Sequence, residues 1–173
     1  MIKGGKGGAN TKAGIEFEGK VDLLNQIDEL PDYDIQNEKI QYKGETVALY
    51  FKKRGLYRHL EKLGVDYRNY ISKRLEPDNA IYVIKNNTIY IIEIKFQNVS
   101  GSVDEKLQTC DFKKKQYMKL FSPLNYEVEY VYILSKWFKK EEYKDVRDYI
   151  ISVGCRFYFE FLPLHELGLP VPE

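Results

Sequence analysis

The sequence predicts a single α/β domain, residues 1–173, in which helices flank a mixed central β-sheet of about five or six strands. Segments with helical periodicity alternate with strand-like segments along the whole chain. Two adjacent segments, 79–85 and 88–96, are apolar on both faces, which is typical of strands in the middle of a covered sheet. Hydrophobic residues make up 43% of the chain, so it can bury a substantial core.

The first half of the chain opens on a glycine-rich stretch, residues 1–11, which we expect to be a mobile arm. Thr11 is a suitable cap for a helix over residues 12–29, and Pro31 ends that helix. The elements expected next are strands at 38–42 and 45–52, joined by Lys43-Gly44, and a short amphipathic helix at 54–63.

The second half begins with the two clearest strands, 79–85 and 88–96, joined by Asn86-Asn87. A helix over 104–121 follows, and Pro123 ends it. The remaining elements expected are a strand at 127–134, a helix at 141–153 and a last strand at 156–161.

Composition excludes several classes of protein. Cys110 and Cys155 are the only cysteines and form no CxxC motif, which argues against a zinc site and against a disulfide framework. No apolar run approaches the roughly 18 residues of a membrane span, and the N-terminus lacks the apolar stretch of a signal peptide. We therefore expect a soluble, cytoplasmic protein with no membrane partner. The net charge of +1 says nothing about a nucleic-acid partner.

The hairpin formed by the two clearest strands carries the candidate active site. A two-residue primed turn at Asn86-Asn87 pairs Asp78 with Lys95 and Ala80 with Glu93. Because side chains alternate along a strand and directly paired residues share a face, these four residues are expected to point the same way.

Two carboxylates and a lysine at the end of a covered strand are costly unless they are paired or bind a metal. Diagonal neighbours have Cβ atoms roughly 7–8 Å apart, so Asp78 and Glu93 can both reach one Mg²⁺ at ~2.1 Å. The alternative is a structural network in which Asp78 pairs with Lys95 and Glu93 is solvated.

Pro77-Asp78, followed 15 residues later by Glu93-Ile94-Lys95, resembles the motif of the PD-(D/E)XK nuclease superfamily. Two further stretches resemble type II restriction endonucleases within it. They are Lys6–Gly14 leading to Phe17-Glu18, and Lys95-Phe96-Gln97 followed by Gly101–Thr109. The expected order of elements also matches the superfamily core over roughly residues 1–135.

The resemblance implies a restriction-endonuclease-like core and a metal-dependent nuclease. Asp78, Glu93 and the backbone carbonyl of Ile94 would bind Mg²⁺, for which Mn²⁺ would substitute, and Lys95 would orient or deprotonate the attacking water or stabilise the charge on the phosphate. Glu18 matches an acid on the first helix that ligates metal or orients the lysine. Glu16 is an alternative to it, and an ordinary surface glutamate is another interpretation.

Other side chains are weaker candidates for DNA contacts: Gln97, Ser102, Lys106, Lys113 and Lys114. Lys106 and Ser102 lie at the start of a helix, a place that suits a phosphate. The plain alternatives are a strand-end glutamine, a helix cap and solvated lysines.

We expect a type II restriction endonuclease that cuts double-stranded DNA, as a homodimer, to 5′-phosphate and 3′-hydroxyl ends. Two-fold protein symmetry is the simplest way to cut both strands of a palindrome. A Holliday-junction resolvase or repair nuclease is the alternative within the superfamily. A non-catalytic nucleic-acid-binding protein is the alternative from another class.

Overall fold

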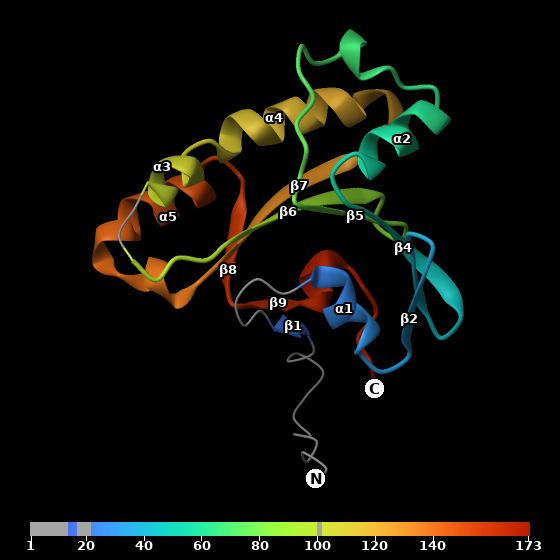
Figure 1. Ribbon diagram of the computed structural model, residues 1–173, viewed down its shortest axis with the longest axis horizontal. Helices are drawn as coiled ribbons and strands as arrows, with labels where there is room; N and C mark the ends of the chain where they lie inside the picture. The colour runs from blue at the N-terminus through green and yellow to red at the C-terminus, as the bar shows by residue number, and fades with distance from the viewer. Residues whose placement is uncertain (1–13, 17–21, 100–101) are drawn as a thin grey trace.

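A computed structural model describes residues 14–16, 22–99 and 102–173. Its centre is a mixed seven-stranded sheet in the order β2-β3-β4-β5-β6-β7-β8 (Figure 1). Neighbouring strands are antiparallel from β2 to β6, whereas β6 and β7 are parallel, as are β7 and β8. The strands are β2 (Tyr33–Gln36), β3 (Lys39–Tyr42), β4 (Glu45–Phe51), β5 (Asn79–Val83), β6 (Thr88–Lys95), β7 (Glu127–Leu134) and β8 (Arg156–Phe159).

Helices cover one face of this sheet, and a smaller layer covers the other (Figure 1). The first layer contains α2 (Gly55–Lys62), α3 (Val103–Leu107), α4 (Cys110–Phe121) and α5 (Lys144–Ser152). The second contains α1 (Leu23–Asp28) and a two-stranded sheet of β1 (Gly14–Glu16) and β9 (Phe161–Pro163). Short 3₁₀ turns complete the chain at Tyr67–Asn69, Ser122–Leu124, Lys136–Lys139, Glu141–Tyr143 and Leu164–Leu167.

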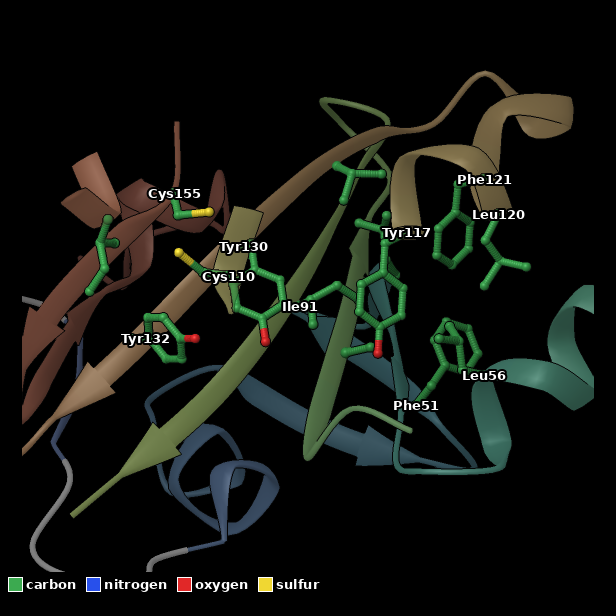
Figure 2. Packing of buried hydrophobic residues seen from close by; sticks show 14 of the residues in the cluster. Phe51, Leu56, Ile91, Cys110, Tyr117, Leu120, Phe121, Tyr130, Tyr132 and Cys155 are labelled. Atoms are coloured by element: carbon green, nitrogen blue, oxygen red, sulfur yellow. The ribbon is translucent and has the colours of Figure 1, made fainter. Parts of the chain in front are cut away.

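Two hydrophobic clusters hold the layers together, one on each face of the sheet. Ala80, Ile89 and Ile91 pack toward α4, and Ile81 and Ile92 pack toward α1. Figure 2 shows Ile91, Tyr117 and Tyr130 inside the first cluster, between α4 and the strands. The expectation that this hairpin is apolar on both faces is therefore confirmed. None of the helices in the described ranges has the length and apolar character that a membrane crossing requires.

Several expected elements differ from those observed. The sheet has seven strands instead of five or six, because β2 (Tyr33–Gln36) pairs with β3 at an edge. The helix expected at 12–29 is wrong over 14–16, which form β1, and the described helix covers only Leu23–Asp28. The mobile arm expected at 1–11 lies outside the described residues.

The helix expected at 104–121 is interrupted at Gln108 and Thr109. In a continuous helix the carbonyl of Lys106 would accept from the N–H of Cys110. Here that carbonyl accepts from the hydroxyl of Thr109, at 2.8 Å, and from the hydroxyl of Tyr132, at 3.3 Å. Side-chain hydroxyls that compete for a backbone carbonyl in this way favour a break, so α3 and α4 are separate helices.

The expected register of the β5–β6 hairpin is also wrong. Ala80 pairs with Ile91 rather than with Glu93, and Val83 with Thr88 is the last pair before the turn. The loop therefore has four residues, 84–87, instead of two. A primed two-residue turn needs positive φ at both central residues, and of Asn86 and Asn87 only Asn87 has it, at φ 53°.

Candidate active site

Asp78, Glu93 and Lys95 lie together at one end of the β5–β6 pair, on the face that α4 covers. Continuing the observed register one residue beyond Asn79 places Asp78 opposite Glu93, with Lys95 diagonal to it. The observed register differs from the expected one by two residues, so the shared face of the three side chains is preserved. Lys95 Nζ lies 2.9 Å from Glu93 Oε2 and 3.5 Å from Asp78 Oδ2.

Glu93 is the buried member of this cluster, with 6% of its surface exposed. Its Oε2 accepts from Lys95, and its Oε1 accepts from Lys113 Nζ at 2.9 Å and from the hydroxyl of Tyr130 at 2.5 Å. Lys113 comes from α4 and Tyr130 from β7. Glu93 is therefore not solvated as the structural alternative expected, since three donors surround this carboxylate inside the protein. The pairing of Asp78 with Lys95 in that alternative is observed.

The cluster keeps both of its central groups charged. Burial acts to raise the pKa of Glu93, but the ammonium groups of Lys95 and Lys113 and the hydroxyl of Tyr130 together hold that pKa below its ordinary value. Burial acts to lower the pKa of Lys95, and the carboxylates of Glu93 and Asp78 outweigh it and raise that pKa. Lys95 is therefore protonated at neutral pH.

Asp78, in contrast, faces an open cavity. Its side chain is 53% exposed, and it lines a hollow of about 540 Å³ together with Ile94 and Lys95. A volume of that order suits a small ligand or one unit of a larger one. The buried carboxylate and the exposed one thus stand side by side, with solvent access on the Asp78 side.

Three oxygen donors of this site have the chemistry that Mg²⁺ prefers. Two are the carboxylates of Asp78 and Glu93, and the third is the carbonyl of Ile94. The carbonyl of Lys95 accepts from the N–H of Ser135, just after β7. Because successive carbonyls point to opposite sides of a strand, the carbonyl of Ile94 points to the other side, where β5 and Asp78 lie. These donors fit a divalent cation, although the described residues contain no group of three or more His, Cys, Asp or Glu side chains placed to hold a metal.

Of four secondary candidates, two lie at the site and two do not. Lys106 lines the same cavity as Asp78, and Lys113 binds Glu93. Lys114 is directed elsewhere, because its Nζ donates to the carbonyl of Gly154 at 2.6 Å. Ser102 is exposed before α3 and makes no side-chain capping bond.

Gln97 is 7% exposed, and its side-chain amide has no hydrogen-bond partner among the residues that the structure describes. Its backbone N–H donates to the hydroxyl of Ser135, and its backbone carbonyl accepts from that hydroxyl. Glu18 lies outside the described residues, and the side chain of Glu16 is not described.

Neither the role of Tyr130 nor the partner of Lys113 was predicted from the sequence. Two signals pointed to them. Lys113 lies on the side of α4 that carries the buried Cys110, Tyr117 and Leu120. A lysine ammonium on that side is expected to pair with an acidic side chain in the protein interior. Tyr130 occupies the middle of an apolar strand, where a buried hydroxyl usually needs a hydrogen-bond partner.

Comparisons with protein-family models, with curated proteins and with solved structures each gave no match for this chain.

Proposed function

We propose that this protein is a Mg²⁺-dependent endodeoxyribonuclease with a restriction-endonuclease-like core. The observation that carries the proposal is the convergence of Asp78, Glu93 and Lys95 on one face, beside an open cavity, at the end of two central strands. These residues form the Pro77-Asp78 and Glu93-Ile94-Lys95 motif, which resembles that of the PD-(D/E)XK nucleases.

The arrangement of the elements around the site gives further support. Three antiparallel strands, β4, β5 and β6, lead through α3 and α4 to β7, which runs parallel to β6. The motif residues lie immediately before the second of these strands and at the end of the third. From β4 to β7 this order matches the one expected from the sequence, which supports the resemblance.

The trio divides two tasks in phosphodiester hydrolysis, metal binding by the carboxylates and hydrogen bonding by the lysine. A Mg²⁺ ion held by these residues would supply an activated water and neutralise charge on the phosphate. Asp78 and Glu93 provide negative oxygen ligands, and Lys113 and Tyr130 hold Glu93 in place. Lys95 is protonated, so it donates hydrogen bonds to the attacking water or to the phosphate oxygens instead of removing a proton. The products carry 5′-phosphate and 3′-hydroxyl ends.

A cleavage assay tests this proposal. The protein is incubated with supercoiled plasmid, a synthetic four-way junction and a linear duplex, each with Mg²⁺, with Mn²⁺ or with EDTA. Discrete plasmid fragments that need the cation support a site-specific type II restriction enzyme, and cleavage of the junction alone supports a resolvase. Binding without cleavage under every metal condition would overturn the nuclease and leave a non-catalytic nucleic-acid-binding protein.

Asp78→Asn is the variant of choice because Asp78 is exposed, and we expect it to fold normally and to lose activity by at least about 100-fold. Asp148→Asn is a matched control, since Asp148 is also exposed, at 63%, and is also paired with a lysine, Lys144. Unchanged cleavage by Asp78→Asn would refute the assignment. The homodimer stays a prediction, which the mass of the DNA-bound protein in solution checks.

A further inference from the structure

The cavity beside Asp78 is richer in lysine than catalysis by the trio requires. Four lysines line it, and only two aspartates do. The formal charge of its lining is therefore +2, although the whole chain carries only +1. The remaining lining residues are Asn79, Ile94, Phe96 and Val103.

Two of the four lysines are already neutralised. Lys52 Nζ lies 2.9 Å from Asp22 Oδ2, and Lys95 is shared between Glu93 and Asp78. The other two, Lys53 and Lys106, are exposed and form no ion pair with any residue that the structure describes. The excess charge of the cavity is therefore carried by these two side chains.

The topology places these two lysines on different elements around the catalytic strands. Lys53 follows β4, which pairs with β5, and Lys106 belongs to α3, which follows β6. Asp78 and Lys95 thus lie between Lys53 and Lys106 along the chain, and all four residues line the cavity. Two separate cations beside a phosphodiester site match two successive backbone charges better than one isolated anion.

The apolar residues of the lining also favour a nucleic-acid strand over inorganic phosphate as the ligand. Phe96 and Val103 line the cavity next to the lysines, and both are half-buried. Inorganic phosphate offers no apolar surface to such residues, whereas the sugars and bases of a nucleic-acid strand do. An aromatic side chain beside a basic groove is a recurring combination in proteins that bind nucleic-acid strands.

We propose that this cavity holds the backbone of the strand to be cut, with Lys53 and Lys106 each neutralising one phosphate that flanks the scissile bond. The inference rests on the proposed nuclease function and adds the residues that bind the phosphate backbone of the substrate. Contacts of this kind give affinity and position without reading sequence, because they address the phosphate and not the base edges.

The salt dependence of binding counts such contacts. Each phosphate neutralised by a protein cation contributes about −0.9 to the slope of log K against log salt concentration for duplex DNA. The experiment measures binding of a fluorescein-labelled 20-base-pair duplex by fluorescence anisotropy over a series of KCl concentrations, in EDTA so that no cleavage occurs. Lys53→Gln and Lys106→Gln should each make the slope shallower by about 0.9, and the double variant by about twice that amount.

Lys43→Gln is the matched control. Lys43 is exposed, lies at the β3–β4 turn at the far end of β4, and has φ 49°, close to the φ of 48° at Lys53. The two lysines therefore share a left-handed backbone conformation, and of the two only Lys53 lines the cavity. The control should keep the slope of the wild type, and thermal melting confirms that all variants fold.

The outcomes separate this inference from the proposed function. Slopes of Lys53→Gln and Lys106→Gln equal to that of the wild type would overturn the inference, even if the protein cleaves DNA. Absence of duplex binding at low salt would overturn it as well. Shallower slopes in a protein that cuts no substrate would support the phosphate contacts of Lys53 and Lys106 and refute the proposed nuclease activity.

Discussion

Removal of the Tyr130 hydroxyl is the sharpest stability test of the buried cluster. Tyr130 is fully buried, and its hydroxyl donates to Glu93 Oε1 at 2.5 Å. Tyr130→Phe deletes that donor and leaves the ring in place, so the change removes one of three hydrogen bonds to a buried carboxylate. A hydrogen bond to a charged group contributes about 1.5–3 kcal/mol to stability. Because Lys95 and Lys113 still neutralise Glu93, we expect a loss of about 2 kcal/mol.

Tyr117→Phe is the control for this measurement. Tyr117 is 2% exposed and lies in the same cluster (Figure 2), but its hydroxyl donates to the uncharged carbonyl of Leu75 at 3.2 Å. A neutral hydrogen bond contributes about 0.5–1.5 kcal/mol. Urea unfolding at pH 7, followed by far-UV circular dichroism, should therefore show Tyr130→Phe to be less stable than Tyr117→Phe by about 1 kcal/mol.

The stability difference between the wild type and Tyr130→Phe should also depend on pH. The pKa of Glu93 is below its ordinary value of 4.5 in the folded protein. The stability that the cluster gains from the ionised carboxylate is thus complete above about pH 4.5 and is lost as the pH falls through the lower, folded value. The gap between wild type and Tyr130→Phe should shrink over that acidic range. Equal costs for the two variants at pH 7, or a gap that grows on acidification, would refute the reasoning.

Three further predictions concern other parts of the molecule. Asn125 ends the 3₁₀ turn before β7 with φ 54°, so Asn125→Val should cost roughly 1–2 kcal/mol in urea unfolding, and Asn125→Gly should cost much less. Burial lowers the pKa of His59 below its ordinary 6.5. The contribution of the neutral imidazole to folding stability is therefore complete above about pH 6.5 and falls as the pH drops toward the folded pKa. His59→Phe should flatten the profile of stability against pH over that range, and an unchanged profile contradicts this. Lys113→Gln leaves the cluster around Glu93 with a net negative charge. Mn²⁺ titration of the DNA-free protein should therefore show at least about fivefold tighter binding, because a unit charge 4 Å away contributes about 1 kcal/mol even in water. Equal or weaker Mn²⁺ binding contradicts the metal assignment.

The faces of the β5–β6 hairpin were predictable, and its register was not. Alternation along each strand determines which side chains share a face, and a shift of two residues leaves that unchanged. The loop length depends on contacts that are distant in the sequence. The side-chain amide of Asn87 donates to the carbonyl of Asn125, and the carbonyl of Asn87 accepts from the N–H of Glu127. These bonds tie the turn to the start of β7, which no local pattern reveals.

The N-terminal helix shows the same limit. The periodicity predicted helix through residues 14–16, but these residues pair with β9 at the other end of the chain. Strand pairing between such distant segments depends on the packing of the second layer beneath the sheet. Local propensity is a weak guide where tertiary contacts of this kind are available.

The sequence by itself determined the trio and its shared face, because Asp78, Glu93 and Lys95 are joined by one short hairpin whose alternation is local. Only the tertiary structure decided the surroundings of the trio. It brought Tyr130 from β7 and Lys113 from α4 onto Glu93, which made this carboxylate the buried one, and it placed Lys53 and Lys106 in one cavity with Asp78. The physical reason is distance along the chain: burial and electrostatic pairing depend on how the layers pack, and that packing joins residues that no period in the sequence connects.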